Sequence, residues 1–170
     1  MSKKCTWFAP LVLVLVAVPV ITHAQVVNLM HTDPSFEDEI IIVSPGWASW
    51  TTYGGGGSVE IDTTDFIDGA KSLRVNQTSG QFNVIAAAIP MTPGERYTCS
   101  FWAKADAPRP ISVRFQSMNN SGFVAGNFDL TTEWAEYTFT EEAPNPNNDI
   151  KLQFITNDAL GISYWLDFVF

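Results

Sequence analysis

Short runs of alternating polar and apolar residues recur from Gln25 onward, and they constrain the fold of this chain more than any other feature. Gly, Pro, Asn and Asp separate the runs, and no sustained helical period interrupts them. Alternation of this kind is typical of strands with one buried face. The number and spacing of the runs predict an all-β fold, a two-sheet antiparallel β-sandwich with jelly-roll topology. The runs cover residues 26–30, 47–51, 58–62, 70–77, 82–89, 96–105, 111–117, 125–130, 135–140, 150–156 and 162–169.

The N-terminal segment has the pattern of a secretory signal peptide. Two lysines precede an unbroken apolar run over residues 11–18, and the segment ends at Ala24, a small residue suited to cleavage. The apolar run is shorter than the roughly 20 residues that a bilayer-spanning helix needs. We therefore predict a signal peptide over residues 1–24 and one domain over residues 25–170. The product is expected to be secreted, periplasmic or extracellular, with no membrane contact after cleavage.

Charge and cysteine content exclude several partners. Removal of the signal leaves seven basic and eighteen acidic residues, a net charge of −11. Such a surface repels nucleic acid and anionic lipid, and no basic cluster offsets it. Cys99 is then the only cysteine, so no internal disulfide can stabilise the exported domain. A bound metal ion is the obvious alternative source of stability. We expect a monomer that does not bind nucleic acid.

Few side chains are suited to catalysis. His31 is the only histidine after the signal, so a Ser-His-Asp or Cys-His arrangement would have to include it. Two carboxylates are enough for glycoside hydrolysis, and the closest pairs are Glu141 with Glu142 and Glu133 with Glu136. These acids lie at strand ends or beside turns, where carboxylates are usually only solvated. The sequence therefore favours a non-catalytic protein, with a small glycan-cleaving enzyme as one alternative.

Alternation also sorts side chains into buried and outward faces. In the run over residues 96–105, Trp102 falls on the outward face. In two later runs Arg114, Gln116 and Gln153 fall on the outward face. These positions predict that one sheet displays amides, a guanidinium and an aromatic ring in rows. Such a surface suits sugars, which need polar partners and a ring to stack on.

Several segments, taken in order along the chain, resemble the family 4/9 group of carbohydrate-binding modules. Trp134 followed by Glu136-Tyr137-Thr138-Phe139 resembles the family's pre-strand Trp pattern. The resemblance covers essentially all of the chain after the signal, and it implies a jelly roll that binds polysaccharide or oligosaccharide chains in a cleft on its concave sheet. The other segments are Asn28-Leu29 with Pro34-Ser35-Phe36-Glu37, Asp68-Gly69 with Ser72-Leu73-Arg74-Val75, Tyr97 with Ser100-Phe101-Trp102-Ala103-Lys104-Ala105, and Trp165-Leu166-Asp167-Phe168-Val169.

The resemblance also implies a structural calcium ion, far from the sugar cleft, that ties both ends of the domain to an early turn. Carried over by position, Glu37, Asp68 and Asp167 would supply carboxylate oxygens, and Ser35 and Lys71 would supply backbone carbonyls. Calcium takes about six to eight oxygen ligands and tolerates irregular geometry. Without the resemblance, each of these acids is an ordinary turn or strand-end carboxylate.

The sugar site is expected on the outward face. The family cleft uses an aromatic residue near the first long strand, where this chain has Phe82 in place of the more usual Trp. Packing under a loop is the alternative role for Trp102 and Trp50, and a cross-strand ion pair with Glu136 is the alternative for Arg114. The predicted sugar partners are Phe82, Trp102, Arg114, Gln116 and Gln153, with Trp50 and Phe123 as rim candidates.

We therefore predict a non-catalytic, calcium-stabilised carbohydrate-binding module. Modules that it resembles are usually attached to glycoside hydrolases and bring the catalytic domain to its substrate. One alternative is a structural or adhesive jelly roll without a working sugar cleft. Another is an accessory fragment of a glycoside hydrolase.

Overall fold

The computed structural model describes residues 33–38, 41–42, 50–144, 149–158 and 161–170. The predicted signal peptide and the strand predicted over residues 26–30 lie outside these ranges. Among the described residues there is no helix, and therefore none that could span a membrane. The strands are β1 (Ile41–Ile42), β2 (Trp50–Tyr53), β3 (Gly57–Asp62), β4 (Ser72–Gln77), β5 (Phe82–Ile89), β6 (Arg96–Ala105), β7 (Arg109–Ser117), β8 (Phe123–Leu130), β9 (Ala135–Glu142), β10 (Ile150–Thr156) and β11 (Tyr164–Asp167).

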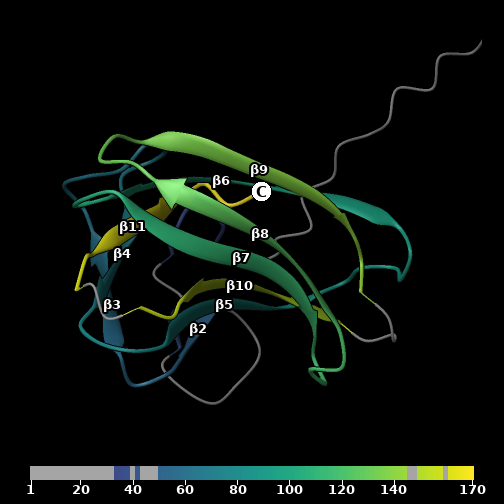
Figure 1. Ribbon diagram of the computed structural model, residues 1–170. Coiled ribbons are helices and arrows are strands. Elements are labelled where there is room, and N and C mark those ends of the chain that lie inside the picture. The colour runs from purple at the N-terminus through teal and green to yellow at the C-terminus, as the bar shows by residue number, and fades with distance from the viewer. Residues whose placement is uncertain (1–32, 39–40, 43–49, 145–148, 159–160) are drawn as a thin grey trace, which may run out of the picture.

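The strands form two sheets, which confirms the predicted β-sandwich. The six-stranded sheet has the order β1-β2-β5-β10-β7-β8, and the five-stranded sheet has the order β3-β4-β11-β6-β9. Strand pairs are antiparallel except for β1 with β2. Figure 1 shows β8, β7, β10 and β5 in succession as curved neighbours. The chain crosses between the sheets from β5 to β6 and from β8 to β9, as a jelly roll requires.

Strand boundaries follow the alternation closely. The strands β5, β6 and β10 have the predicted bounds, whereas β11 ends at Asp167, two residues before the predicted end. The early end has a local cause. The backbone N–H of Phe168 donates to Asp167 Oδ1 at 2.7 Å, and Phe168 adopts a φ of 43°. A side-chain oxygen thereby replaces a ladder acceptor and turns the chain out of the sheet.

The core lies between the two sheets, and Phe101 of β6 is at its centre. Its ring contacts those of Phe128 and Phe154 edge-to-face, at centroid distances of 5.4 and 5.1 Å, and it stacks on Tyr137 at 5.5 Å. Every one of these residues comes from the inward positions of its strand, as the alternation predicts. Cys99 is buried in the same layer, and burial raises the pKa of its thiol to about 12.

A buried guanidinium connects three separate segments. Arg109, at the start of β7, is 1% exposed. Its Nη2 donates to Gln77 Oε1 at 2.6 Å and to the Asp158 carboxylate at 3.0 Å, and its Nη1 donates to the carbonyl of Ile162. The guanidinium also lies 5.3 Å from the ring centroid of Tyr164, whose pKa burial raises. Arg109 therefore joins β4, β7 and the segments around β11.

Candidate functional site

The outward side chains of the six-stranded sheet lie in rows across its strands. In the central row, cross-strand register joins Thr51, Ile85, Gln153, Arg114 and Ala125 from β2, β5, β10, β7 and β8. Most of their neighbours along the strands belong to the core, so this row faces away from it. We call the outward side of these five strands the polar face.

The guanidinium of Arg114 is held in place in the central row. Its Nε donates to Gln153 Oε1 at 2.9 Å, and its carbon lies 5.3 Å from the ring centroid of Phe123. Burial lowers the pKa of Arg114. No described residue accepts a hydrogen bond from its two terminal nitrogens or from Gln153 Nε2. Both side chains therefore have fixed positions and unused donors.

A second row lies beside the first, nearer the end of β10. It joins Tyr53, Asn83, Ile155, Ser112 and Asn127 in cross-strand register. Asn83 is 3% exposed, and within the described part of the chain its Oδ1 is a buried acceptor without a donor. Such an orphaned acceptor costs about 1–3 kcal/mol unless a partner arrives. A hydroxyl group is a partner of the right size and polarity.

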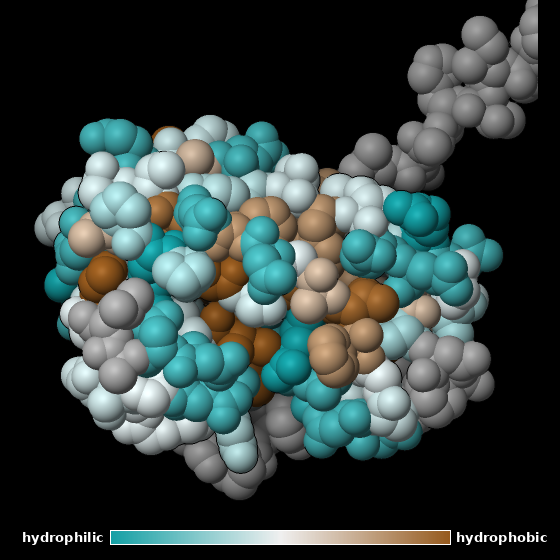
Figure 2. Space-filling model, in the orientation of Figure 1, coloured by the Kyte–Doolittle hydropathy of each residue, from teal (hydrophilic) through white to brown (hydrophobic). Residues whose placement is uncertain are grey.

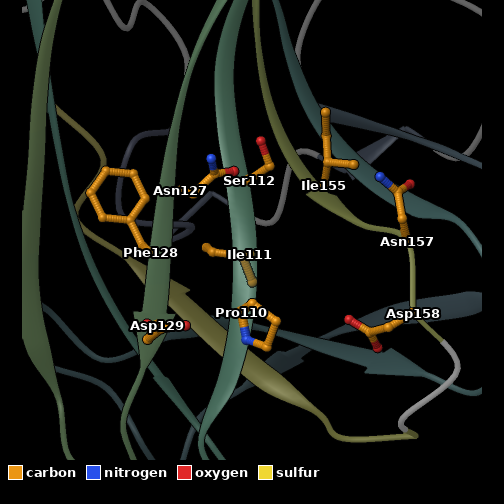
Figure 3. A pocket seen from close by; sticks show the side chains of 9 residues that line it. All are labelled: Pro110, Ile111, Ser112, Asn127, Phe128, Asp129, Ile155, Asn157 and Asp158. Carbon is orange, nitrogen blue, oxygen red and sulfur yellow. The ribbon is translucent and has the colours of Figure 1, made fainter.

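A hollow of about 420 Å³ occupies this end of the polar face. Figure 3 shows Ser112 and Asn127 side by side, with Ile155 and Asn157 across from them. Hydroxyl, amide and carboxylate groups therefore surround an apolar floor. The lining residues are Pro110, Ile111, Ser112, Asn127, Phe128, Asp129, Ile155, Asn157 and Asp158.

Exposed rings lie at the two edges of the polar face. Tyr53 at the end of β2 is 61% exposed, and Phe123 at the start of β8 is 59% exposed. Four strand spacings separate β2 from β8, roughly 19 Å across the sheet. In the orientation of Figure 1, Figure 2 shows apolar side chains between hydrophilic ones near the middle of the surface.

Three of the five predicted sugar partners share this face. Arg114, Gln116 and Gln153 lie on adjacent strands β7 and β10, and the rim candidate Phe123 lies directly beside Gln116. The alternative ion pair between Arg114 and Glu136 is wrong, because Glu136 belongs to β9 of the other sheet.

The predicted aromatic partners are not on the polar face. Phe82 is 2% exposed in the core, since it occupies an inward position of β5. Trp102 points outward, but from β6 of the five-stranded sheet, where it pairs with Asp167 and Glu136. Trp50 is also in the core, and its indole N–H donates to the carbonyl of Asp33 at 3.0 Å. The prediction that one sheet displays Trp102 with the amides is therefore wrong.

Sequence reasoning missed Tyr53, Asn83, Asn127 and Asn157. The pattern in the printed sequence that points to Asn83 is a single amide inside an otherwise apolar run over residues 82–89. A polar residue in such a run is worth a partner search, because burial without a hydrogen bond is costly. Tyr53 and Asn127 carry no comparable signal, since only the strand register places them on this face.

The residues predicted as calcium ligands come together over the outer side of the five-stranded sheet. We call Ser35, Glu37, Asp68, Lys71 and Asp167 the terminal clasp. Glu37 Oε1 accepts the backbone N–H groups of Ala70 and Lys71 at 2.7 and 2.9 Å. Asp167 Oδ2 accepts those of Ile67 and Asp68 at 2.8 and 3.0 Å. The Ser35 hydroxyl donates to Asp68 at 3.2 Å.

Gly69 is required at the turn of the clasp. Its φ is 64°, and a Cβ at this position would lie 2.2 Å from Glu37 Oε1. Only glycine combines this backbone conformation with so close an approach. The Asp68-Gly69 turn thus places two backbone N–H groups against the Glu37 carboxylate.

The clasp suits a hard cation by its chemistry. All of its candidate donors are oxygens, and Asp167 is fully buried beside Asp68. Burial raises the pKa of Asp167, as does the charge of Asp68, whereas hydrogen bonds from backbone N–H groups act in the opposite direction. Glu37 Oε2 and Asp68 Oδ1 accept no hydrogen bond from a described residue. Nevertheless, no three acidic, histidine or cysteine side chains among the described residues have an arrangement that could hold a metal ion.

Solved structures with a similar fold include carbohydrate-binding modules and part of a phage tailspike. One described as "CBM4 structure and function" superposes with a TM-score of 0.58 at 21% identity, over 82% of this chain and 96% of its own. A module described as TmCBM61 in complex with β-1,4-galactotriose gives 0.61 at 13% identity, over 85% and 97%. Tailspike protein 4 of bacteriophage CBA120 gives 0.63 at 15% identity over 82% of this chain, which spans only 20% of the tailspike chain.

The sequence itself identifies the family. Residues 30–160 match the family model of the carbohydrate-binding domain CBM_4_9, and the chain therefore belongs to this family. The resemblance inferred from the motifs is confirmed. Domains of this kind are generally non-catalytic and typically extracellular. A search of curated protein sequences found no match.

Proposed function

We propose that the polar face binds a polysaccharide or oligosaccharide chain, and that the protein is a non-catalytic carbohydrate-binding module. The observation that carries this proposal is unused hydrogen-bonding capacity on one face. The terminal nitrogens of Arg114, Gln153 Nε2 and the buried Asn83 Oδ1 have no partner among the described residues. Sugar hydroxyls both donate and accept, so they can pair with the donors of Arg114 and Gln153, and with Asn83 Oδ1 once its amide rotates toward the surface.

The shape of the face is consistent with a chain ligand. The hollow beside Ile155 offers an apolar floor with polar walls, which suits the two kinds of surface on a pyranose ring. Tyr53 and Phe123 offer rings at the edges. A chain that crosses the strands would contact both rings and the central row.

Removal of the orphaned acceptor gives a sharp test. Asn83→Leu is expected to weaken glycan binding about tenfold, because one hydrogen bond to the ligand is lost. The same change should leave the melting temperature unchanged or raise it, since a buried unpaired amide is replaced by an apolar group of similar size. Affinity electrophoresis against soluble glucans, xylans and mannans, followed by isothermal titration with the best ligand, measures both effects.

The matched control lies on the opposite sheet. Trp102→Leu is expected to leave binding unchanged, since Trp102 faces away from the polar face. Loss of binding in this variant but not in Asn83→Leu would place the site on the five-stranded sheet. Absence of binding to every glycan would favour the alternative, a structural or adhesive jelly roll.

We also propose that the terminal clasp holds a calcium ion. Glu37, Asp68 and Asp167 would supply carboxylate oxygens after their side chains rearrange from the hydrogen bonds described above, and the ion would neutralise part of this acidic charge. Bound calcium would stabilise the native state and play no part in sugar contact, because the clasp and the polar face lie on opposite sheets.

Chelation tests the calcium proposal. Free calcium at about a hundred times its Kd stabilises the folded state by about 2.7 kcal/mol, so EDTA should lower the melting temperature by roughly 5–10 °C. Asp68→Ala should melt at the same temperature with and without EDTA, whereas Asp106→Ala, an exposed control, should respond like the wild type. An unchanged wild-type melting curve contradicts the proposal.

The proposal also covers export, oligomeric state and attachment to an enzyme. Residues 1–24 would direct export, and the mature domain would act as a monomer. As an accessory module of a glycoside hydrolase, it would bring the catalytic domain to its substrate.

A further inference from the structure

Positive charge gathers on the polar face, although the chain has a net charge of −9. Arg114 of β7 and Lys151 of β10 both point outward there, and they lie in adjacent rows. The charge of Arg114 contributes to lowering the pKa of Lys151, after the larger effect of burial. The fold thus holds two cations close enough to repel each other.

The guanidinium of Arg114 has a neutral side chain as its hydrogen-bond partner. Arg114 donates to the amide of Gln153, and Lys151 Nζ donates to Asn120 Oδ1 at 2.5 Å. Among the described residues, no carboxylate forms a salt bridge with Arg114. Of the other arginines, Arg74 and Arg109 each have an acidic partner, Glu60 and Asp158, whereas the exposed Arg96 donates to the carbonyl of Thr140.

The acidic residues of the polar face lie away from Arg114. On the described outward positions of the polar face the one acid is Asp129 of β8, four residues along the strand from Ala125, the cross-strand partner of Arg114. Asp149 precedes β10, two residues from Lys151 and four residues from Gln153. Four residues of strand span about 13 Å, which exceeds the Debye length at physiological salt. Neither acid therefore neutralises Arg114.

The free edge of Arg114 has the geometry for a planar anion. Its Nε is occupied by Gln153 and its face lies against Phe123, which leaves the terminal nitrogens for a ligand. A guanidinium that offers two parallel N–H groups matches a carboxylate better than a hydroxyl or a tetrahedral anion. Because the side chain is already positioned, little further entropy is lost on binding.

We propose that the glycan is acidic, and that a uronic acid carboxylate binds Arg114 at the cationic part of the polar face. This inference rests on the proposed glycan-binding function and specifies its substrate class. Lys151 adds positive potential at the same place. The hollow beside Ser112 and Asn127 would then take a neighbouring sugar through its hydroxyls.

Carboxyl reduction provides a matched test. Polygalacturonate, alginate and glucuronoxylan are each compared by isothermal titration with the same polymer after its carboxyl groups have been reduced to hydroxymethyl groups. At least one acidic polymer should bind about tenfold more tightly than its reduced form. An increase of NaCl from about 0.05 to 0.5 M should remove most of that difference and leave neutral glycans unaffected.

Two variants test whether Arg114 causes the difference in affinity between an acidic polymer and its reduced form. Arg114→Gln keeps a hydrogen-bonding group but removes the charge, and it should abolish the preference for the acidic polymer. Arg96→Gln removes the same charge from β6 of the other sheet and should keep the preference. Dextran sulfate serves as the non-specific polyanion and should bind more weakly than the preferred uronate.

The outcomes separate this inference from the proposed function. Equal or tighter binding of every reduced polymer overturns the acidic substrate and leaves glycan binding intact. Tighter binding of dextran sulfate, or a preference that survives in Arg114→Gln, overturns the assignment to a carboxylate on Arg114. Failure to bind any neutral, acidic or reduced polymer overturns the glycan-binding function itself.

Discussion

Arg109→Met is expected to lower the free energy of unfolding by about 3–5 kcal/mol and the melting temperature by roughly 10 °C. The guanidinium of Arg109 is buried, and it is the common donor to Gln77, Asp158 and the carbonyl of Ile162. Its loss leaves a partly buried carboxylate and two polar acceptors without this donor. Urea unfolding followed by tryptophan fluorescence measures the change.

An exposed arginine provides the control for this experiment. Arg96→Met removes the same charge from the start of β6, where the side chain is exposed and makes one long hydrogen bond of 3.3 Å to Thr140. Its effect should stay within about 0.5 kcal/mol. A loss below about 1 kcal/mol in Arg109→Met would contradict the role of the guanidinium in joining three segments.

Asp167→Ala is expected to cost about 3–4 kcal/mol even in EDTA, where no calcium contributes. The fully buried Asp167 carboxylate accepts the backbone N–H groups of Ile67, Asp68 and Phe168. Hydrogen bonds to a charged acceptor contribute about 1.5–3 kcal/mol each, less the cost of burying the charge. Thermal unfolding in EDTA measures the loss directly.

Two variants make the result specific. Asp167→Asn keeps one acceptor oxygen but presents an NH₂ group to backbone donors, so its stability should fall between those of the wild type and the alanine variant. Asp106→Ala, which truncates an exposed acid on the loop after β6, should change stability by about 0.5 kcal/mol or less. Equal stability of the wild type and Asp167→Ala would show that the clasp does not support the fold.

The strands were predictable because the alternation of polar and apolar residues is a local pattern within each strand. In β6 and β10 the alternation of apolar and polar residues specifies both the strand and its buried side, and the bounds of both agree with the structure. The sheet that a strand joins depends on pairing with segments far away in the sequence. Trp102 shows the difference, since its outward direction was predictable and its sheet was not.

The sequence also left open which side of β5 faces the core. Phe82, Val84 and Ala86 are apolar on one side, and Ile85 is apolar on the other, so alternation alone does not say which side enters the core. The structure buries Phe82 and directs Asn83 toward the polar face. The family resemblance favoured the aromatic Phe82 as the sugar partner, whereas the strand register brings the amide of Asn83 to the polar face.

The segments that carry the predicted calcium ligands are hydrogen-bonded to one another, but which hydrogen bonds join them was not predictable. No three acids among the described residues are arranged to hold a metal ion, so the calcium site stays a prediction. Which oxygen of Glu37 accepts which backbone N–H depends on the turn at Gly69 and on its positive φ. That turn is visible in the sequence as Asp68-Gly69. The sequence does not show that this turn lies against Glu37, because 31 residues separate Glu37 from Gly69 and only folding brings them into contact.

The backbone N–H of Val169 donates to the carbonyl of Pro34 at 2.9 Å, so the first and last described segments are hydrogen-bonded to each other. A unit whose two ends are already joined can be inserted into a loop of another protein without being pulled apart. It can also be circularly permuted with a short connection, with new ends opened in the exposed glycines near Gly55. Insertion would leave the polar face, on the sheet opposite the clasp, free to meet a ligand, whereas a permutant opened near Gly55 would have its new ends beside Tyr53.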